Sequence, residues 1–459
     1  MWKPCVTLLA ALALLGCSQR EAAAPPLPHA PAQWRHASGQ ADAVDAAWWR
    51  AFGSAELDRL VAEALAHSPD LASAAARVQQ AEASARLAGA ALLPRLDASL
   101  AGSREARLGG NPATAGNHYN GSLAASYEVD LWGRLRSTRQ AAELDLRASA
   151  FDRDALQVSL SAAVATTWLQ GVGLRERTRI AALNLANAER VLRTVEARWR
   201  AGAAVALELA QQRGVVATQQ RLLADLRQQA EDSRTALAVL LGVSVTELDG
   251  VSAAQLDAVL APALGAGLPS ALLERRPDLA RAEAALLAGD ADVAAARAAL
   301  LPRLDLAAAL SGGNGSLSRL FADPVYSLGA ALTAPIFDNG RLAAERDLAI
   351  GRRAELLADY RGAIVAAFAD VEVALNALSG SAAKRAAQDE VLSQAQLAFR
   401  LAEARYRAGA DTLLTLLDAQ RTLYAAQDEL AQFQLERLQA SVGLYRALGG
   451  GWPGATALR

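Results

Sequence analysis

The sequence contains few cysteine, histidine and aromatic residues and carries almost no net charge. Its two cysteines, Cys5 and Cys17, lie within the first seventeen of 459 residues, which excludes a disulfide or a thiolate metal site in the rest of the chain. The four histidines are scattered and form no helical HExxH pair. We therefore predict neither an enzyme nor a cofactor or metal site. A formal net charge of -2 provides no basic surface for nucleic acid.

What the sequence has is a long internal repeat. Pro69–Asp97 aligns without a gap on Pro277–Asp305, with 16 of 29 residues identical, and Glu196–Gly202 recurs as Glu403–Gly409 with six of seven identical. A repeat of this length is a duplicated half-domain rather than a short solenoid unit. We predict one body built from two halves, although the length alone would suggest about three domains.

The N-terminus has the pattern of a processed export signal. Lys3 precedes the apolar run Val6–Leu15, and Leu14-Leu15-Gly16-Cys17 looks like a bacterial lipoprotein cleavage box. We predict a signal peptide at 1–16 and a lipid on Cys17; the alternative is an ordinary secretory signal with an incidental cysteine. Residues 17–42 are rich in Ala and Pro and are predicted to be an extended tether.

The two halves have the same predicted order of elements. Pro94 and Pro302 each end a helix, and the residues after them alternate polar with apolar or small, as in a half-buried strand. The predicted domains are a first repeat at 43–242, a connector at 243–267, a second repeat at 268–449 and a tail at 450–459. We expect β-hairpins at about 95–131 and 303–337, and helical hairpins at about 134–241 and 341–448.

The predicted strands have the length that crosses a membrane in a barrel, roughly 9 to 13 residues. Four strands cannot close a membrane barrel, because about eight are the fewest known, so several chains must contribute. Trp132 and Phe337 at the strand ends suit an interfacial aromatic belt; the alternative is a capped turn with the ring in the core. Gly312–Gly315 is predicted to be a loop tip, because no Lys-Ser/Thr pair follows to make a phosphate loop.

Two uninterrupted helices dominate the predicted fold. Arg134–Arg200 and Arg341–Arg407 contain no proline, and each is about 100 Å long at 1.5 Å per residue. Leu392, Ala395, Phe399, Ala402 and Tyr406 follow the spacing of a coiled-coil seam. The uncharged stretch 155–174 is long enough for a transmembrane helix, but its polar residues and its place inside a longer helix favour burial in a bundle.

Several motifs together resemble one protein family. They are the paired Pro-Asp-Leu and Leu-Pro-Arg-Leu-Asp segments, Trp48–Gly53, Asp130–Arg134 and Leu416–Arg421. In these residues the chain, from about Asp45 to Gly449, is similar to the TolC-like outer membrane factor family, in its lipoprotein (OprM-like) branch. The resemblance implies a membrane α+β fold in which four strands per chain build a trimeric 12-stranded β-barrel. An antiparallel α-helical coiled-coil barrel continues it across the periplasm.

The resemblance also implies a gate at the far end of the helical tunnel. Carboxylates beyond the second helical turn ring the closed mouth in the family. Asp418 matches such a position, Thr415 stands where the family commonly has Asp, and Glu208 is the equivalent place in the first repeat. Tyr406 matches a latch residue. Asp411 falls where some relatives have Arg, so the chain departs from the family at the position of a salt-bridge latch. Three Asp418 carboxylates would repel one another and attract cations; the alternative is an exposed helix carboxylate.

The two helical turns are the remaining candidate site. Arg200-Ala201-Gly202 and Arg407-Ala408-Gly409 should be exposed, since turns lie outside a bundle. In the family such tips meet a periplasmic adaptor; the alternative is that the glycines serve packing alone. The other partners that the resemblance implies are two sister subunits, an RND-type inner-membrane pump and outer-membrane lipid.

We predict a passive, lipid-anchored outer-membrane channel of a tripartite efflux system for small molecules. One alternative is a conduit for type I protein secretion. Another, from a different class, is a periplasmic coiled-coil scaffold lipoprotein without a pore; two alternating hairpins at matching positions argue against it.

Overall fold

The computed structural model describes residues 28–36, 44–106, 109, 116–248, 255–262 and 265–454. The predicted signal peptide, Cys17 and most of the predicted tether lie outside the described residues, so their assignment stays a prediction. The described residues from position 31 onward form one compact unit, which contains every element described below.

The long helices repeat from one half to the other. Helices α3 (Pro69–Ala90) and α7 (Pro277–Ala298) each have 22 residues, and α4 (Arg134–Arg200) and α8 (Arg341–Arg407) each have 67. These ranges confirm the predicted bounds of both long helices. The remaining helical elements are η1 (Trp48–Phe52), α2 (Ala55–His67), α5 (Ala206–Leu241), η3 (Leu256–Ala258), η4 (Pro269–Ala271), α6 (Leu272–Arg275), η5 (Leu317–Arg319) and α9 (Leu413–Ala447).

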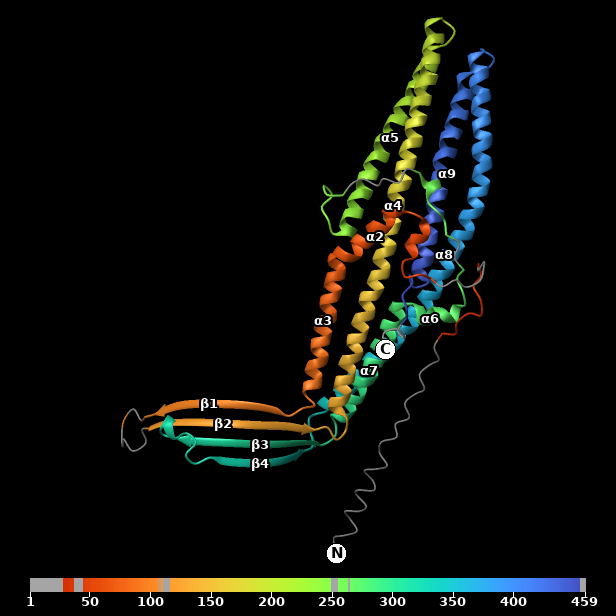
Figure 1. Ribbon diagram of the computed structural model, residues 1–459. Helices are drawn as coiled ribbons and strands as arrows, with labels where there is room; N and C mark the ends of the chain where they lie inside the picture. The colour runs from red at the N-terminus through yellow and green to blue at the C-terminus, as the bar shows by residue number, and fades with distance from the viewer. Residues whose placement is uncertain are drawn as a thin grey trace. The chain divides into compact units, whose positions relative to one another are not determined.

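Each long helix folds back on its return helix. Helix α4 packs against α5, and α8 packs against α9, as two antiparallel hairpins whose tips point away from the sheet (Figure 1). Helices α3 and α7 run beside the part of α4 that is nearest the sheet (Figure 1). The predicted seam on α8 is confirmed, because Ala395, Phe399, Ala402 and Tyr406 are buried.

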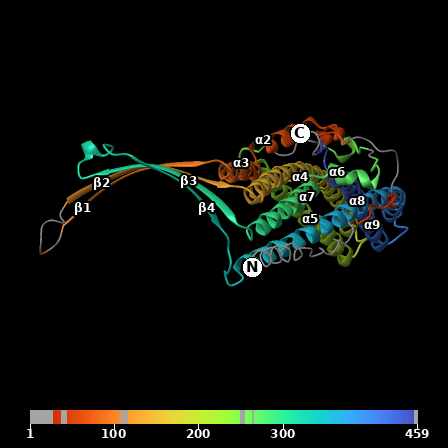
Figure 2. The ribbon, with the colours of Figure 1, turned by 90° about the horizontal axis from the view of Figure 1, so that it is seen from below.

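The two halves meet in one antiparallel sheet. Strands β1 (Arg95–Glu105), β2 (Gly116–Val129), β3 (Arg303–Asn314) and β4 (Val325–Thr333) pair in the order β1-β2-β3-β4. The pairing of β2 with β3 joins the repeats, with residues 119–129 against 304–314. Figure 2 shows the four strands leaving the helices together as one curved ribbon. Both predicted hairpins are thus present, and the structure adds the pairing between them.

Two predicted strand boundaries are wrong in the second half. Gly312 and Gly313 belong to β3 rather than to a loop, because they pair with Gly121 and Asn120. A Cβ on Gly312 would lie 2.4 Å from the carbonyl oxygen of Leu320, so the turn around η5 packs directly on this strand. At the other end, β4 stops at Thr333 instead of reaching Phe337, since Pro335 cannot donate a hydrogen bond to a neighbouring strand.

The main apolar core lies in the middle of the helical body. Trp48 stacks on Tyr445 with ring centroids 4.9 Å apart, and the indole Nε1 of Trp168 donates to Glu56 Oε2 at 2.9 Å. Most of the uncharged stretch 155–174 is buried or half-buried here, which confirms bundle burial for that segment. Among the described residues, α8 is the one helix long and apolar enough to pass for a membrane span, and 28% of its apolar window is buried within the chain.

Candidate functional site

The sheet has one apolar face and one polar face. On the apolar face, Leu96, Leu100, Leu328 and Leu332 are 64% to 78% exposed. The paired register places Leu123, Leu304, Leu306 and Leu310 on the same face. The opposite face carries mostly Ser, Ala and Gly, with a cross-strand hydrogen bond of 2.8 Å between the hydroxyls of Ser99 and Ser122. An apolar outer face and a polar inner face are what a membrane barrel requires.

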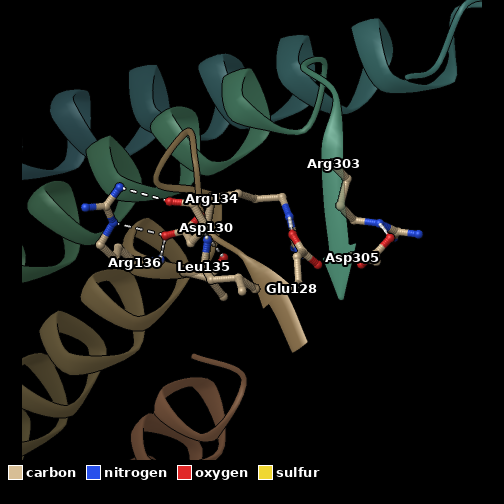
Figure 3. Close-up of polar contacts among 8 residues, drawn as sticks. Glu128, Asp130, Arg134, Leu135, Arg136, Arg303 and Asp305 are labelled. Carbon is tan, nitrogen blue, oxygen red and sulfur yellow. Dashed lines mark hydrogen bonds and ion pairs between the residues drawn. The ribbon is translucent and has the colours of Figure 1, made fainter. Parts of the chain in front are cut away.

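The sheet joins the helices through charged side chains. Asp130, directly after β2, accepts hydrogen bonds from the backbone N–H of Leu135 at 3.1 Å and of Arg136 at 3.0 Å (Figure 3). This caps the start of α4 with a carboxylate, which the helix dipole favours. The matching residue in the second half is Asp338, which accepts from the backbone N–H of Gly340 at 3.0 Å and of Leu342 at 2.9 Å. Both strand-to-helix junctions are therefore held in a defined geometry.

Near the far tips, one set of contacts ties the two helical hairpins together. The Tyr406 hydroxyl on α8 donates to Glu208 Oε2 on α5 at 3.2 Å. Arg198 on α4 lies over the Tyr406 ring, 4.5 Å from its centroid, and donates to the Tyr406 backbone carbonyl. The structure therefore brings together Tyr406 and Glu208, two of the predicted gate residues. Sequence reasoning did not single out Arg198, because its contact with Tyr406 joins residues 208 positions apart and leaves no local pattern in the sequence.

The Tyr406 hydroxyl stays protonated over the physiological pH range. Burial raises the pKa of Tyr406 to about 12, and the nearby Glu208 carboxylate acts in the same direction, while Arg198 lowers it. The folded pKa lies above the ordinary value of 10. The contribution of the protonated Tyr406 hydroxyl to the free energy of unfolding is therefore fully present below pH 10. It is lost only as the pH rises through about 12.

Asp411 and Thr415 contact each other rather than the other hairpin. Asp411 accepts from the backbone N–H of Thr412 at 2.8 Å, from the Thr415 hydroxyl at 2.9 Å and from Arg405 Nε at 3.1 Å. The pKa of Asp411 is lowered, first by the Thr412 N–H and then by the Thr415 hydroxyl, with Arg405 contributing. These bonds hold the turn before α9 in place, and all of them lie within a single hairpin.

Asp418 and the two turns are exposed in the single chain. Within the part of the chain that the structure describes, no side-chain partner faces the Asp418 carboxylate. All six tip residues, Arg200 to Gly202 and Arg407 to Gly409, are exposed, as predicted. Gly202 and Gly409 both have a φ of 72°, the left-handed conformation that ends a helix most easily with glycine.

Comparison with known proteins agrees with this architecture. The sequence model of the family described as "Outer membrane efflux protein" matches residues 60–243 and 268–450, one segment in each repeat. The chain belongs to this family. It is 50% identical to the pyoverdine export outer membrane protein OpmQ of Pseudomonas aeruginosa, with 97% of each chain covered. It is also 34% identical to the outer membrane protein OprJ of the same organism, over 97% of this chain and 95% of OprJ.

A solved structure shows the same fold. The outer-membrane channel OprN superposes with a TM-score of 0.85 at 29% identity, over 94% of this chain and 99% of OprN. The chain is thus an efflux channel of the outer membrane that extends into the periplasm. Its strands contribute to a trimeric barrel, and it works with an adaptor and an inner-membrane pump. The prediction of an efflux channel is therefore confirmed, rather than the alternative of a periplasmic scaffold lipoprotein without a pore.

Proposed function

We propose that this chain is the passive outer-membrane duct through which a cell exports pyoverdine or a chemically similar metabolite. The observation that carries the proposal is the 50% identity to the pyoverdine export protein OpmQ over 97% of both chains. A second OpmQ, from Pseudomonas putida, is 48% identical, whereas OprJ and CusC are 34% and 32% identical. The two OpmQ proteins are named for pyoverdine export and CusC for cation efflux, which supports transport without catalysis by the chain itself.

Deleting the gene from its own bacterium tests the proposed cargo. We expect the exported metabolite to fall in the medium and to accumulate in the periplasm, as measured by mass spectrometry of both fractions. Re-expression of the wild-type chain should restore the secreted amount. An unchanged distribution of metabolites, together with the loss of a protein from the medium, would instead support the conduit for protein secretion.

The gate residues are proposed to hold the periplasmic end closed. The bond between Tyr406 and Glu208, with Arg198 across the ring, supports a latch between the two hairpins of one chain. The exposure of Asp418 near the tips supports a ring of carboxylates in the trimer. Asp411 and Thr415 are proposed to stabilise the turn beside this ring. We also propose that Cys17 carries the lipid, which mass spectrometry of the mature N-terminal peptide would detect.

The exposed tips are proposed to bind the adaptor. Gly202→Trp combined with Gly409→Trp should abolish capture of the chain by its tagged adaptor, because two bulky rings then occupy the turns. Gly202→Ala with Gly409→Ala is the matched control. It carries the same strain of a side chain at positive φ, about 1–2 kcal/mol per site, but adds only a methyl group. Capture that survives the tryptophan pair would exclude a docking role.

A further inference from the structure

The polar face of the sheet carries a compact group of charges at its helix end. Its members are three arginines and three carboxylates, which we call the junction collar: Arg95, Asp97, Glu128, Arg134, Arg303 and Asp305. The register places all five of its strand residues on the same face as Ser99 and Ser122. Because the other face is apolar and must contact lipid, this face lines the interior of the barrel.

The charges of the collar are paired within each repeat. Arg95 Nε lies 2.8 Å from Asp97 Oδ2, and Arg303 Nε lies 2.8 Å from Asp305 Oδ2. Residues two apart on a strand share a face, so each pair projects into the same space. Both arginines are more than half exposed in the single chain, at 76% and 56%. They are therefore free to meet a solute as well as their own carboxylates.

The third pair of the collar links the strands to α4. Glu128 on β2 stands directly opposite Asp305 on β3, a placement that is unfavourable for two like charges. Arg134, the first residue of α4, donates three hydrogen bonds of 2.7, 2.8 and 3.2 Å to the Glu128 carboxylate, while Arg303 binds Asp305 (Figure 3). The two arginines offset the repulsion and keep positive and negative groups side by side.

Next to the collar, the same face carries mostly small side chains. They are Ser99, Ser122, Ala124, Ser126, Ala307, Ala309, Ser311, Ser327, Gly329 and Ala331, with Val325 opposite Ser311; Asn120 and His118 follow only further out. Such side chains cannot reach far into a lumen. Over this stretch of the barrel, the long charged side chains of the collar are the groups that come nearest to a passing solute.

We propose that the junction collar lines the conduit where barrel and helical tunnel meet, and that it determines which charged solutes pass. A ring of one sign repels solutes of that sign, whereas adjacent groups of both signs offer a partner to each. The collar therefore suits organic solutes that carry acidic and basic groups together. This inference rests on the proposed function, because it requires the strands to enclose a transport path.

Ion selectivity in planar bilayers tests the collar, with potassium chloride gradients and purified trimers. Arg95→Gln with Arg303→Gln leaves unpaired carboxylates, and we expect the cation-to-anion permeability ratio to rise several-fold above wild type. Asp97→Asn with Asp305→Asn leaves unpaired arginines, and the ratio should fall several-fold. Neutralising all four residues should return the ratio towards the wild-type value. Arg59→Gln, at an exposed pair on α2, is the control and should change nothing.

The outcomes separate the collar from the proposed function. Conductance without any change of permeability ratio in either double variant would overturn the collar while leaving the channel intact. Absence of conductance in the wild-type trimer would instead overturn the transport path itself. If the double variants fail to assemble, the accessibility of introduced cysteines is measured instead. A charged thiol reagent should block conductance of the Ser99→Cys channel but not of the Ala98→Cys channel, whose cysteine lies on the opposite face. Equal effects on both channels would contradict the proposal.

Discussion

At the scale of single residues, the same sequence motif makes different contacts in the two repeats. Arg198 and Arg405 occupy equivalent places before the two helical turns. Arg198 crosses to the other hairpin and contacts Tyr406, whereas Arg405 binds Asp411 within its own turn. The difference follows from the residue that comes next, since Trp199 stands where the second repeat has Tyr406. Only Tyr406 brings a hydroxyl that can donate to Glu208.

The first prediction concerns this hydroxyl. Tyr406→Phe should increase the open fraction of the channel, because it removes a hydrogen bond to a carboxylate, a type of bond that contributes about 1.5–3 kcal/mol. Single-channel recording measures the open fraction directly. Tyr424→Phe is the matched control, since its hydroxyl bonds Gln420 within the same helix. An open fraction that rises equally in both variants, or in neither, would contradict the latch.

At the scale of elements, helices were more predictable than strands. The ends of α4 and α8 follow from local chemistry, because glycine stops each helix at the same place in each repeat. The end of β3 depends instead on what lies against it. Gly312 looks like a loop residue in sequence, yet it is glycine because the Leu320 backbone packs on the strand. A contact of this kind, between two segments of the chain, produces no periodic pattern in the sequence.

Gly312→Ala should therefore reduce assembly of the barrel. The added methyl group would meet the Leu320 carbonyl oxygen at 2.4 Å, and overpacking of this kind costs about 1–3 kcal/mol. The amount of heat-modifiable trimer in outer-membrane fractions, read on gels, reports the effect. Gly329→Ala on β4 is the control, because nothing lies within 4 Å of its added Cβ. Equal trimer levels in the two variants would show that the η5 turn can move aside.

At the scale of the whole molecule, function depends on surfaces that one chain cannot complete. Four strands leave two open edges, β1 and β4, which must pair with sister subunits to close a barrel. In the assembled trimer, each charged residue near the tips occurs once in every subunit. Asp418 is exposed and has no partner among the described residues, and we propose that in the trimer it is one member of a ring of carboxylates.

Asp418→Ala should enlarge the single-channel conductance and weaken the preference for cations. The reason is that a ring of carboxylates narrows the entrance and raises the local concentration of cations. Reversal potentials and unit conductance in planar bilayers measure both quantities. Glu63→Ala serves as the control, because it removes a carboxylate from α2 that already pairs with Arg59. If both quantities stay at wild-type values, the ring does not form the entrance.

The sequence by itself determined the duplication, the two long helical hairpins, the membrane-crossing strands and the family. These features follow from patterns in the sequence: an internal repeat, proline and glycine at helix ends, and alternation of polar and apolar residues along strands. The tertiary structure alone decided that β2 pairs with β3, that Arg198 and Glu208 meet Tyr406, and that six charges gather where the strands join the helices. Those contacts join residues up to about two hundred positions apart in the chain. Packing of the whole fold determines which of these residues meet, and no local sequence pattern records it.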